Sequence, residues 1–286
     1  MRQVRHFIGS WTIVCDVAGR VTRGDGASPF VTVAAVALAP EVRDGVRGRL
    51  IRAFDGAPVK WSAAGLPGLL KVTGLVSKYS LPILIRKVHR AEAWKTFWRD
   101  GDAFSSRMAS LVGERVRYFG SDAIMKTILF ISAFGALTGY LMAMRRVPEV
   151  ARPDHPMAVE FTVINDMDIE DAETRTLFAS YVEGWPEVTG FMAELGVVPH
   201  TKVRFEREED EPLLLLPDYL AGGFLHADSR ANLTKPVARP QEVQPVIERF
   251  SRRHGRLLMV QDGEFQDPYP LDLEKDAVTR RYKSGS

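Results

Sequence analysis

The chain has 286 residues, of which 45% are hydrophobic and 26% charged, a composition that is ordinary for a globular protein and excludes wholesale disorder. Its 38 basic and 36 acidic residues give a net charge of +2, which excludes a strongly basic nucleic-acid binder but not a local basic face. Cys15 is the only cysteine, so an intramolecular disulfide and a zinc site made of cysteine pairs are also excluded. The first residues lack the apolar segment of a signal peptide, and we therefore predict a cytoplasmic protein.

The first predicted elements form a β-hairpin. Residues Trp11 to Ala18 are rich in β-branched side chains, and Phe30 to Leu38 form a second apolar run. Asp25-Gly26 between them is a typical hairpin signal, so the two strands are expected to pair antiparallel. A third strand is predicted over Arg49 to Phe54.

The next stretch combines helices with one strand. The segment from Val59 to Lys78 is predicted to form a helix that begins near Lys60-Trp61, and Pro67 must break or kink it. A buried strand is predicted over Ser80 to His89, followed by a helical insertion over residues 91–146.

One segment of this insertion raises the question of a membrane. Thr127 to Met144 are 18 residues without a charge, which is the lower limit for a membrane-spanning helix. Glycine, serine and threonine make the segment only moderately hydrophobic, and no other span supports it. We favour a buried helix over a membrane anchor, and a membrane partner is not expected.

The second half of the chain supplies two more strands and a glycine-rich helix. Strands are predicted over Met157 to Asp166 and, as the last strand, over Lys202 to Glu208. A late helix is predicted to begin at Asp218 in the sequence LLLLPDYLAGGF. This order predicts an α/β domain, a mixed sheet with helices on both faces, over residues 1–230. Residues 231–286 are predicted to be an extension with a short helix and a polar tail.

Three acidic residues stand at the ends or inside predicted apolar elements, namely Asp16, Asp166 and Asp218. Asp16 lies inside its strand and Asp166 at the carboxyl end of another; on adjacent strands, both could converge near the carboxyl ends, where ligands of α/β sheets gather. Carboxylates that face each other repel unless a cation neutralises them, and Mg²⁺ suits their oxygens. Simpler roles are also open, because Asp166 could start a loop and Asp218 could favour the positive end of its helix. His226 lies two turns after Asp218, and we interpret it as a histidine with satisfied hydrogen bonds.

Several short motifs carry a resemblance to a known family. They are VCDVAG around Asp16, Lys60-Trp61, LIRKV, TVIND before Asp166 and LPDYLAGGF around Asp218. Together they resemble the bacterial family catalogued as domain of unknown function 3800, over roughly Val14 to Phe224. The resemblance implies a ribonuclease H-like fold in which Asp16, Asp166 and Asp218 match the family's candidate metal-binding acids.

The resemblance and the acids predict a nuclease that hydrolyses phosphodiester bonds with Mg²⁺ or Mn²⁺. Asp16, Asp166 and Asp218 would hold the metal and carry catalysis, and Lys60 or Lys87 would contact the substrate phosphate. Nucleic acid is then the expected partner. The alternative is a non-catalytic interaction subunit in a mobile-element or anti-phage system, because Val17 and Ala18 follow Asp16, whereas the family commonly has glutamate and serine there.

The glycine that follows Asp218 by one helical turn carries a further expectation. Gly222 is predicted to keep this helix face clear for a ligand or for backbone.

Overall fold

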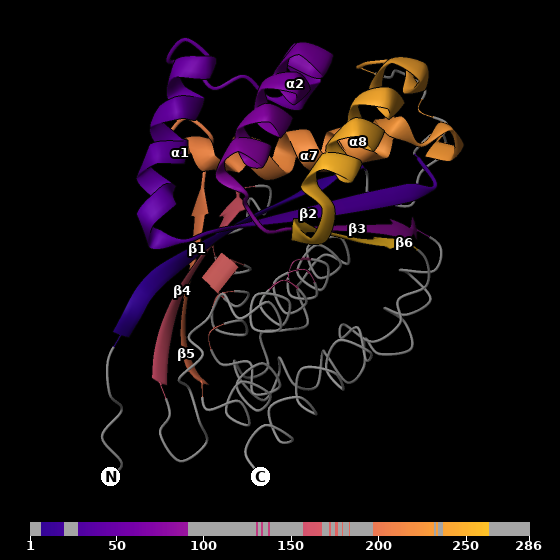
Figure 1. Cartoon of the computed structure of the whole chain (residues 1–286). Helices are drawn as coiled ribbons and strands as arrows, with labels where there is room; N and C mark the ends of the chain where they lie inside the picture. Colours follow the sequence, from indigo (N-terminus) through magenta and orange to yellow (C-terminus); the bar gives the residue numbers. More distant parts are fainter. Residues whose placement is uncertain are drawn as a thin grey trace, which may run out of the picture.

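The computed structural model describes residues 7–19, 28–90, 157–167, 197–231 and 237–262, together with single residues between these ranges. These residues form an α/β structure with a six-stranded mixed sheet of order β5-β4-β1-β2-β3-β6. The helices α1, α2, α7 and α8 lie on one face of this sheet (Figure 1). The predicted α/β class with a mixed sheet is confirmed.

Three strands from the N-terminal part form an antiparallel half-sheet. Strand β1 (Phe7–Ala18) pairs antiparallel with β2 (Phe30–Leu38), as the hairpin signal predicts. Strand β3 (Ile83–His89) pairs antiparallel with β2 on its other side. The β-branched and small apolar residues of β2 are buried from Val31 to Leu38, which is expected for a strand with partners on both edges.

Two parallel strands extend the sheet on the other side of β1. Strand β4 (Met157–Asp166) has the predicted bounds and runs parallel to β1, with Asn165 opposite Cys15. Strand β5 (Val197–Glu206) runs parallel to β4 and begins before the predicted range. Asp16 and Asp166 each follow the last residue that pairs between β1 and β4. The two acids are therefore neighbours near the carboxyl ends of these adjacent strands.

The predicted strand over Arg49 to Phe54 is wrong. These residues belong mostly to helix α1 (Pro40–Ala53), which has proline in its first turn and Glu41 beside it. Val46 and Leu50 are its buried residues, and their spacing of four places both on one helical face. The short apolar stretch after Arg49 resembles a strand, but the helical spacing of Val46 and Leu50 determines the fold.

Helix α2 (Trp61–Tyr79) starts where the sequence predicts and contains the predicted kink. The kink lies at Gly65, with φ 52° and ψ −133°, two residues before Pro67. A positive φ costs glycine little, and the proline ring cannot follow a regular helical turn.

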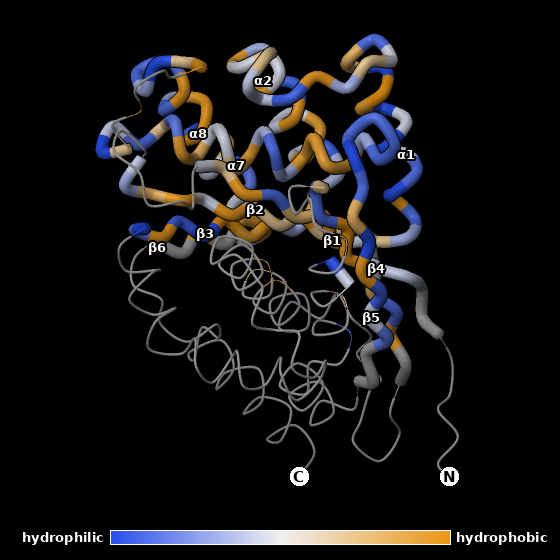
Figure 2. Tube along the Cα trace, turned by 180° about the vertical axis from the view of Figure 1, so that it is seen from behind, coloured by the Kyte–Doolittle hydropathy of each residue, from blue (hydrophilic) through white to orange (hydrophobic). Residues whose placement is uncertain are grey.

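Helix α7 (Leu215–Ala227) is the centre of the hydrophobic core. It follows a 3₁₀ turn (Pro212–Leu214) and packs on β1, β2 and α2. Most of its residues are buried, which explains its nearly continuous apolar sequence. Figure 2 shows hydrophobic residues concentrated in α7 and in the strands beneath it, whereas α1 is largely hydrophilic.

The residues after α7 add a helix and a strand to the same layers. Helix α8 (Pro240–His254) packs on α7 and α2, and strand β6 (Leu258–Asp262) pairs parallel with β3. Two 3₁₀ turns, Ser229–Ala231 and Gly255–Leu257, lie before and after α8. The prediction that the sheet ends with Lys202 to Glu208 is therefore wrong. The division into a domain over 1–230 and an extension over 231–286 stays a prediction.

Most of the helical insertion over residues 91–146 lies outside the described residues. Phe130, Ala133 and Leu137 of the segment Thr127 to Met144 are helical and at most 1% exposed. Among the described residues, no helix is both long and apolar enough to cross a membrane.

Candidate functional site

Two of the predicted acids, Asp16 and Asp166, point towards the helix layer. Val14 and Ile164, two residues before them on β1 and β4, belong to the core between sheet and helices, and side chains two apart share a face of a strand. Both carboxylates are 6% exposed. The sequence prediction that these two acids converge at the carboxyl ends of their strands agrees with this register.

Each of these carboxylates accepts a hydrogen bond from the backbone of the next residue. Asp16 Oδ1 accepts from the Val17 N–H at 2.6 Å, and Asp166 Oδ1 accepts from the Met167 N–H at 2.7 Å. Such bonds favour the charged carboxylate and fix its direction.

The third predicted acid, Asp218, lies in the first turn of α7, three residues after the helix begins. Its Oδ2 accepts a hydrogen bond of 2.6 Å from the Trp61 N–H, the first residue of α2. The next residue, Tyr219, donates from its hydroxyl to the Val59 carbonyl at 2.6 Å. Two neighbouring side chains of α7 therefore hold the backbone on both sides of Lys60.

A fourth acid, Glu208, completes the group and was missed by the sequence analysis. It lies in the turn after β5 and is 3% exposed. In the sequence it is one of several acids in EREEDE, a run that is typical of a solvated loop. No spacing distinguishes Glu208 from its exposed neighbour Glu209, so only the three-dimensional structure identifies it. We call Asp16, Asp166, Glu208 and Asp218 the acidic cluster.

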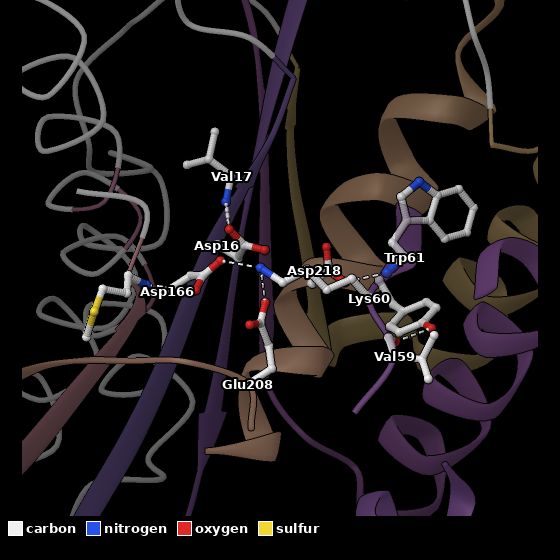
Figure 3. Close-up of polar contacts among 10 residues, drawn as sticks. Asp16, Val17, Val59, Lys60, Trp61, Asp166, Glu208 and Asp218 are labelled. Carbon is white, nitrogen blue, oxygen red and sulfur yellow. Dashed lines mark hydrogen bonds and ion pairs between the residues drawn. The ribbon is translucent and has the colours of Figure 1, made fainter. Parts of the chain in front are cut away.

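The ammonium group of Lys60 lies between two members of the acidic cluster. Lys60 Nζ is 3.0 Å from Asp166 Oδ2 and 2.5 Å from Glu208 Oε1. Figure 3 shows these two carboxylates on either side of the ammonium group, with Asp16 and Asp218 beside them. Burial alone would lower the pKa of Lys60, but the carboxylates of Glu208 and Asp166 outweigh it and raise this pKa above its ordinary value.

The charge of Asp218 is poorly compensated. Burial raises its pKa to about 6, although the Trp61 hydrogen bond and the Lys60 charge act in the opposite direction. Glu208 and Asp166 raise it further by repulsion. One ammonium group therefore does not neutralise the acidic cluster, and a further positive charge would stabilise it.

Gly222 does not keep a helix face clear for a ligand or backbone, and that prediction is wrong. A Cβ at Gly222 would lie 2.5 Å from Cδ1 of the Trp61 indole, so the missing side chain makes room for this ring. The ring also contacts His226 edge to face, with centroids 5.0 Å apart. The glycine positions Trp61, and through it the start of α2, against α7.

His226 has the satisfied hydrogen bonds that the sequence analysis favours. Its Nδ1 lies 2.8 Å from the Gly222 carbonyl, and its Nε2 accepts from the Val237 N–H at 3.3 Å. Burial lowers its pKa, which favours the neutral ring. His226 therefore packs against the back of the site and does not face the acidic cluster as a ligand.

The second candidate for a phosphate contact, Lys87, lies away from Lys60. It forms an ion pair with Asp228, the residue that follows the C-terminal end of α7, whereas Asp218 lies in the first turn of that helix. Its ammonium group also lies 4.6 Å from the centre of the Phe30 ring. The structure thus brings together Lys60 and the three predicted acids but places Lys87 in a different ion pair.

The donors of the acidic cluster suit a hard divalent cation, because all are carboxylate oxygens. Among the described residues, however, no three His, Cys, Asp or Glu side chains form a ready-made metal site. Two of the acids, Asp166 and Glu208, hold an ammonium group instead.

Comparison with known proteins does not assign the chain to a family. No family model matches the chain, and no curated protein is significantly similar to it. The resemblance to the domain of unknown function 3800 family therefore stays a prediction that rests on the motifs quoted above.

Proposed function

We propose that the protein is a nuclease of ribonuclease H-like fold that hydrolyses phosphodiester bonds with Mg²⁺ or Mn²⁺. The observation that carries the proposal is that the buried Asp166 and Glu208 share the Lys60 ammonium group, and that Asp218 lies close enough to interact electrostatically with all three. Asp16 stands beside Asp166, one residue beyond the pairing of β1 with β4. Three elements far apart in the sequence, β1, β4 and α7, supply the predicted acids. Structural ion pairs seldom require this many buried carboxylates, because each costs solvation energy.

The sheet supports the fold assignment. Three antiparallel strands, β1 to β3, are followed by two strands that add in parallel on the free side of β1. This is the arrangement expected of a ribonuclease H-like sheet, with β6 as an addition at the far edge. The three predicted acids lie near the end of β1, at the end of β4 and on the helix α7 that follows β5.

Within this proposal, Asp16, Asp166 and Asp218 hold the metal, which supplies Lewis-acid stabilisation of the reacting phosphate oxygens. The Trp61 N–H fixes the direction of the Asp218 carboxylate. Lys60, whose side chain is 46% exposed, is the residue that contacts a substrate phosphate, and nucleic acid is the substrate. A cytoplasmic location and a role in mobile elements or phage defence are parts of this proposal that come from the sequence alone.

A second candidate function is a non-catalytic interaction subunit of the same fold. Its supporting observation is the pair of contacts from Lys60 to Asp166 and Glu208, which neutralise two carboxylates without any metal. In a degenerate enzyme, such a lysine would keep the remaining acids compatible with folding.

Calorimetric titration with Mn²⁺ separates the two functions. We expect the wild type to bind Mn²⁺ and to cut at least one of four substrates, single- or double-stranded DNA or RNA. Asp218→Asn keeps the acceptor for the Trp61 N–H but loses the charge, so it should weaken Mn²⁺ binding at least about tenfold and abolish cleavage.

The matched control is Asp44→Asn, which removes a carboxylate that is 81% exposed on α1. It should bind Mn²⁺ as the wild type does. A wild type that neither binds Mn²⁺ nor cuts any of the four substrates would contradict the nuclease and favour the interaction subunit.

A further inference from the structure

The position of Lys60 conflicts with a metal ion in the same cluster. Its ammonium nitrogen lies within 3.0 Å of Asp166 and Glu208 at once. Carboxylate oxygens bind Mg²⁺ at about 2.1 Å, so a cation shared by these two acids would occupy nearly the volume of the ammonium group. The same oxygens cannot serve both cations.

The side chain of Lys60 can rotate into solvent, whereas its backbone is held in place by hydrogen bonds. The backbone is fixed by the Tyr219 hydroxyl on Val59 and by the Asp218 carboxylate on the Trp61 N–H. The side chain is 46% exposed, so rotation about its own bonds is enough to carry the ammonium group into solvent. Movement of α2 is not required.

Glu208 is the residue that depends most on a cation. Its side chain is only 5% exposed, and Lys60 is its ion-pair partner. Within the described part of the chain, its Oε1 accepts no well-aligned hydrogen bond from any donor. A buried carboxylate that lost Lys60 and stayed charged would cost several kcal/mol, so departure of Lys60 at a pH where carboxylates are charged favours the arrival of a second cation.

We propose that Glu208 is the fourth carboxylate of the metal site and that the Lys60 ammonium occupies this site until a divalent cation displaces it. The inference rests on the proposed function, since it concerns the same site. Lys60 and the metal then exclude each other at the acidic cluster. The displaced ammonium group reaches solvent beside the site, where it meets the phosphate of an incoming nucleic acid.

The test is Mn²⁺ titration of Lys60→Met and Glu208→Gln near pH 8, where carboxylates are charged. Lys60→Met removes the competing charge, so it should bind Mn²⁺ at least about tenfold more tightly than the wild type. Glu208→Gln removes a ligand and should bind at least about tenfold more weakly. The controls are Lys71→Met, an exposed lysine on α2, and Glu209→Gln, the exposed neighbour of Glu208.

The outcomes distinguish this inference from the proposed function. Equal or weaker binding by Lys60→Met than by a wild type that binds Mn²⁺ overturns the inference and leaves the nuclease standing. Binding by Lys60→Met but not by the wild type shows that no divalent cation displaces the native ammonium group, which overturns both the displacement and the nuclease. Absence of binding by both proteins overturns the inference and the nuclease together.

Chemical labelling of the wild type provides a test that needs no variant. An amine-reactive reagent should modify Lys60 faster when Mg²⁺ is present, because the ammonium group has left its two carboxylates. Lys71, whose Nζ donates to the Ala53 carbonyl, is the internal reference in the same digest. An unchanged ratio of Lys60 to Lys71 labelling at saturating Mg²⁺ overturns the inference.

Discussion

Asp218 illustrates how a single residue links stability to the site. Its carboxyl group is stabilised by the Trp61 N–H but destabilised, in its charged form, by burial and by two neighbouring acids. The pKa of Asp218 is about 6 in the folded protein and 3.8 for an unperturbed aspartate. Between these values the folded protein keeps a proton that the unfolded chain has released.

The free energy of unfolding should therefore contain a contribution from Asp218 that falls as the pH rises from about 4 to about 6. Asp218→Asn removes this contribution. We therefore expect the change in the free energy of unfolding that Asp218→Asn causes in the metal-free protein to be more stabilising at pH 8 than at pH 4, by about 1–3 kcal/mol. Urea denaturation of both proteins in EDTA at the two pH values measures the difference. A difference of the opposite sign, or none, would show that the charge of Asp218 is already fully compensated.

The residues of the site differ in how far a sequence can predict them. Asp16 interrupts a strand of apolar residues, and Asp166 ends one, so each contrasts with its neighbours. Lys60 was predicted from a short motif, whereas no sequence signal predicted Glu208. A buried glutamate in a run of acids is distinguished only by its contact in the folded structure. Here this contact is the ion pair with Lys60, which lies far away in the sequence.

Helices α2 and α7 fit together through glycines that admit aromatic rings. A Cβ at Gly68 of α2 would lie 2.2 Å from the Tyr219 ring of α7, and one at Gly222 of α7 would lie 2.5 Å from Trp61 of α2. The close approach is reciprocal, since each helix supplies one glycine and one ring. It sets the spacing of the two elements that carry Lys60 and Asp218.

Gly68→Ala and Gly74→Ala separate this packing from helix propensity. Both glycines lie in α2, but a Cβ at Gly74 meets no atom within 4 Å. We expect Gly74→Ala to stabilise the protein by about 0.5–1 kcal/mol and Gly68→Ala to destabilise it by about 1–3 kcal/mol. Thermal unfolding of both variants gives the comparison. Two stabilised variants would mean that the Tyr219 ring can move aside at little cost.

At the scale of elements, the sequence predicts best where a pattern and a turn signal agree. The hairpin of β1 and β2 has two apolar runs and Asp-Gly between them, and its pairing is confirmed. The strand expected at Arg49 was supported only by a short apolar stretch, and the buried Val46 and Leu50 belong to a helix instead. The kink at Gly65 was predictable because proline cannot continue a helix, whatever packs around it.

For the whole molecule, the residues after α7 are structurally continuous with the core. Val243, Ile247 and Phe250 of α8 are buried in the same hydrophobic cluster as α2 and α7. Strand β6 adds to β3, a strand from the first third of the chain. This pairing could not be predicted, because nothing local in the sequence of β6 specifies a partner so far away.

Truncation tests whether residues 1–230 are a domain on their own. Removing residues 231–286 exposes the surface that α8 covers, and each large apolar side chain lost from a core costs about 1.5–3 kcal/mol. Since domains are stable by about 5–15 kcal/mol, we expect the 1–230 fragment to lack a cooperative melting transition in circular dichroism. A fragment of residues 1–262 keeps every described element and is the control. A cooperative transition in the shorter fragment would establish the predicted domain.

The place of β1 in the sheet also has a consequence for how the chain folds during synthesis. This strand is made first, yet it is the strand between the antiparallel and the parallel halves of the sheet. Its edge towards β2 is paired once residue 38 has been made, whereas its edge towards β4 waits until residue 166. A nascent chain therefore carries an apolar strand with one open edge through much of its synthesis, and such edges recruit other chains. We expect the yield of folded protein to depend on chaperones that cover this edge until β4 arrives.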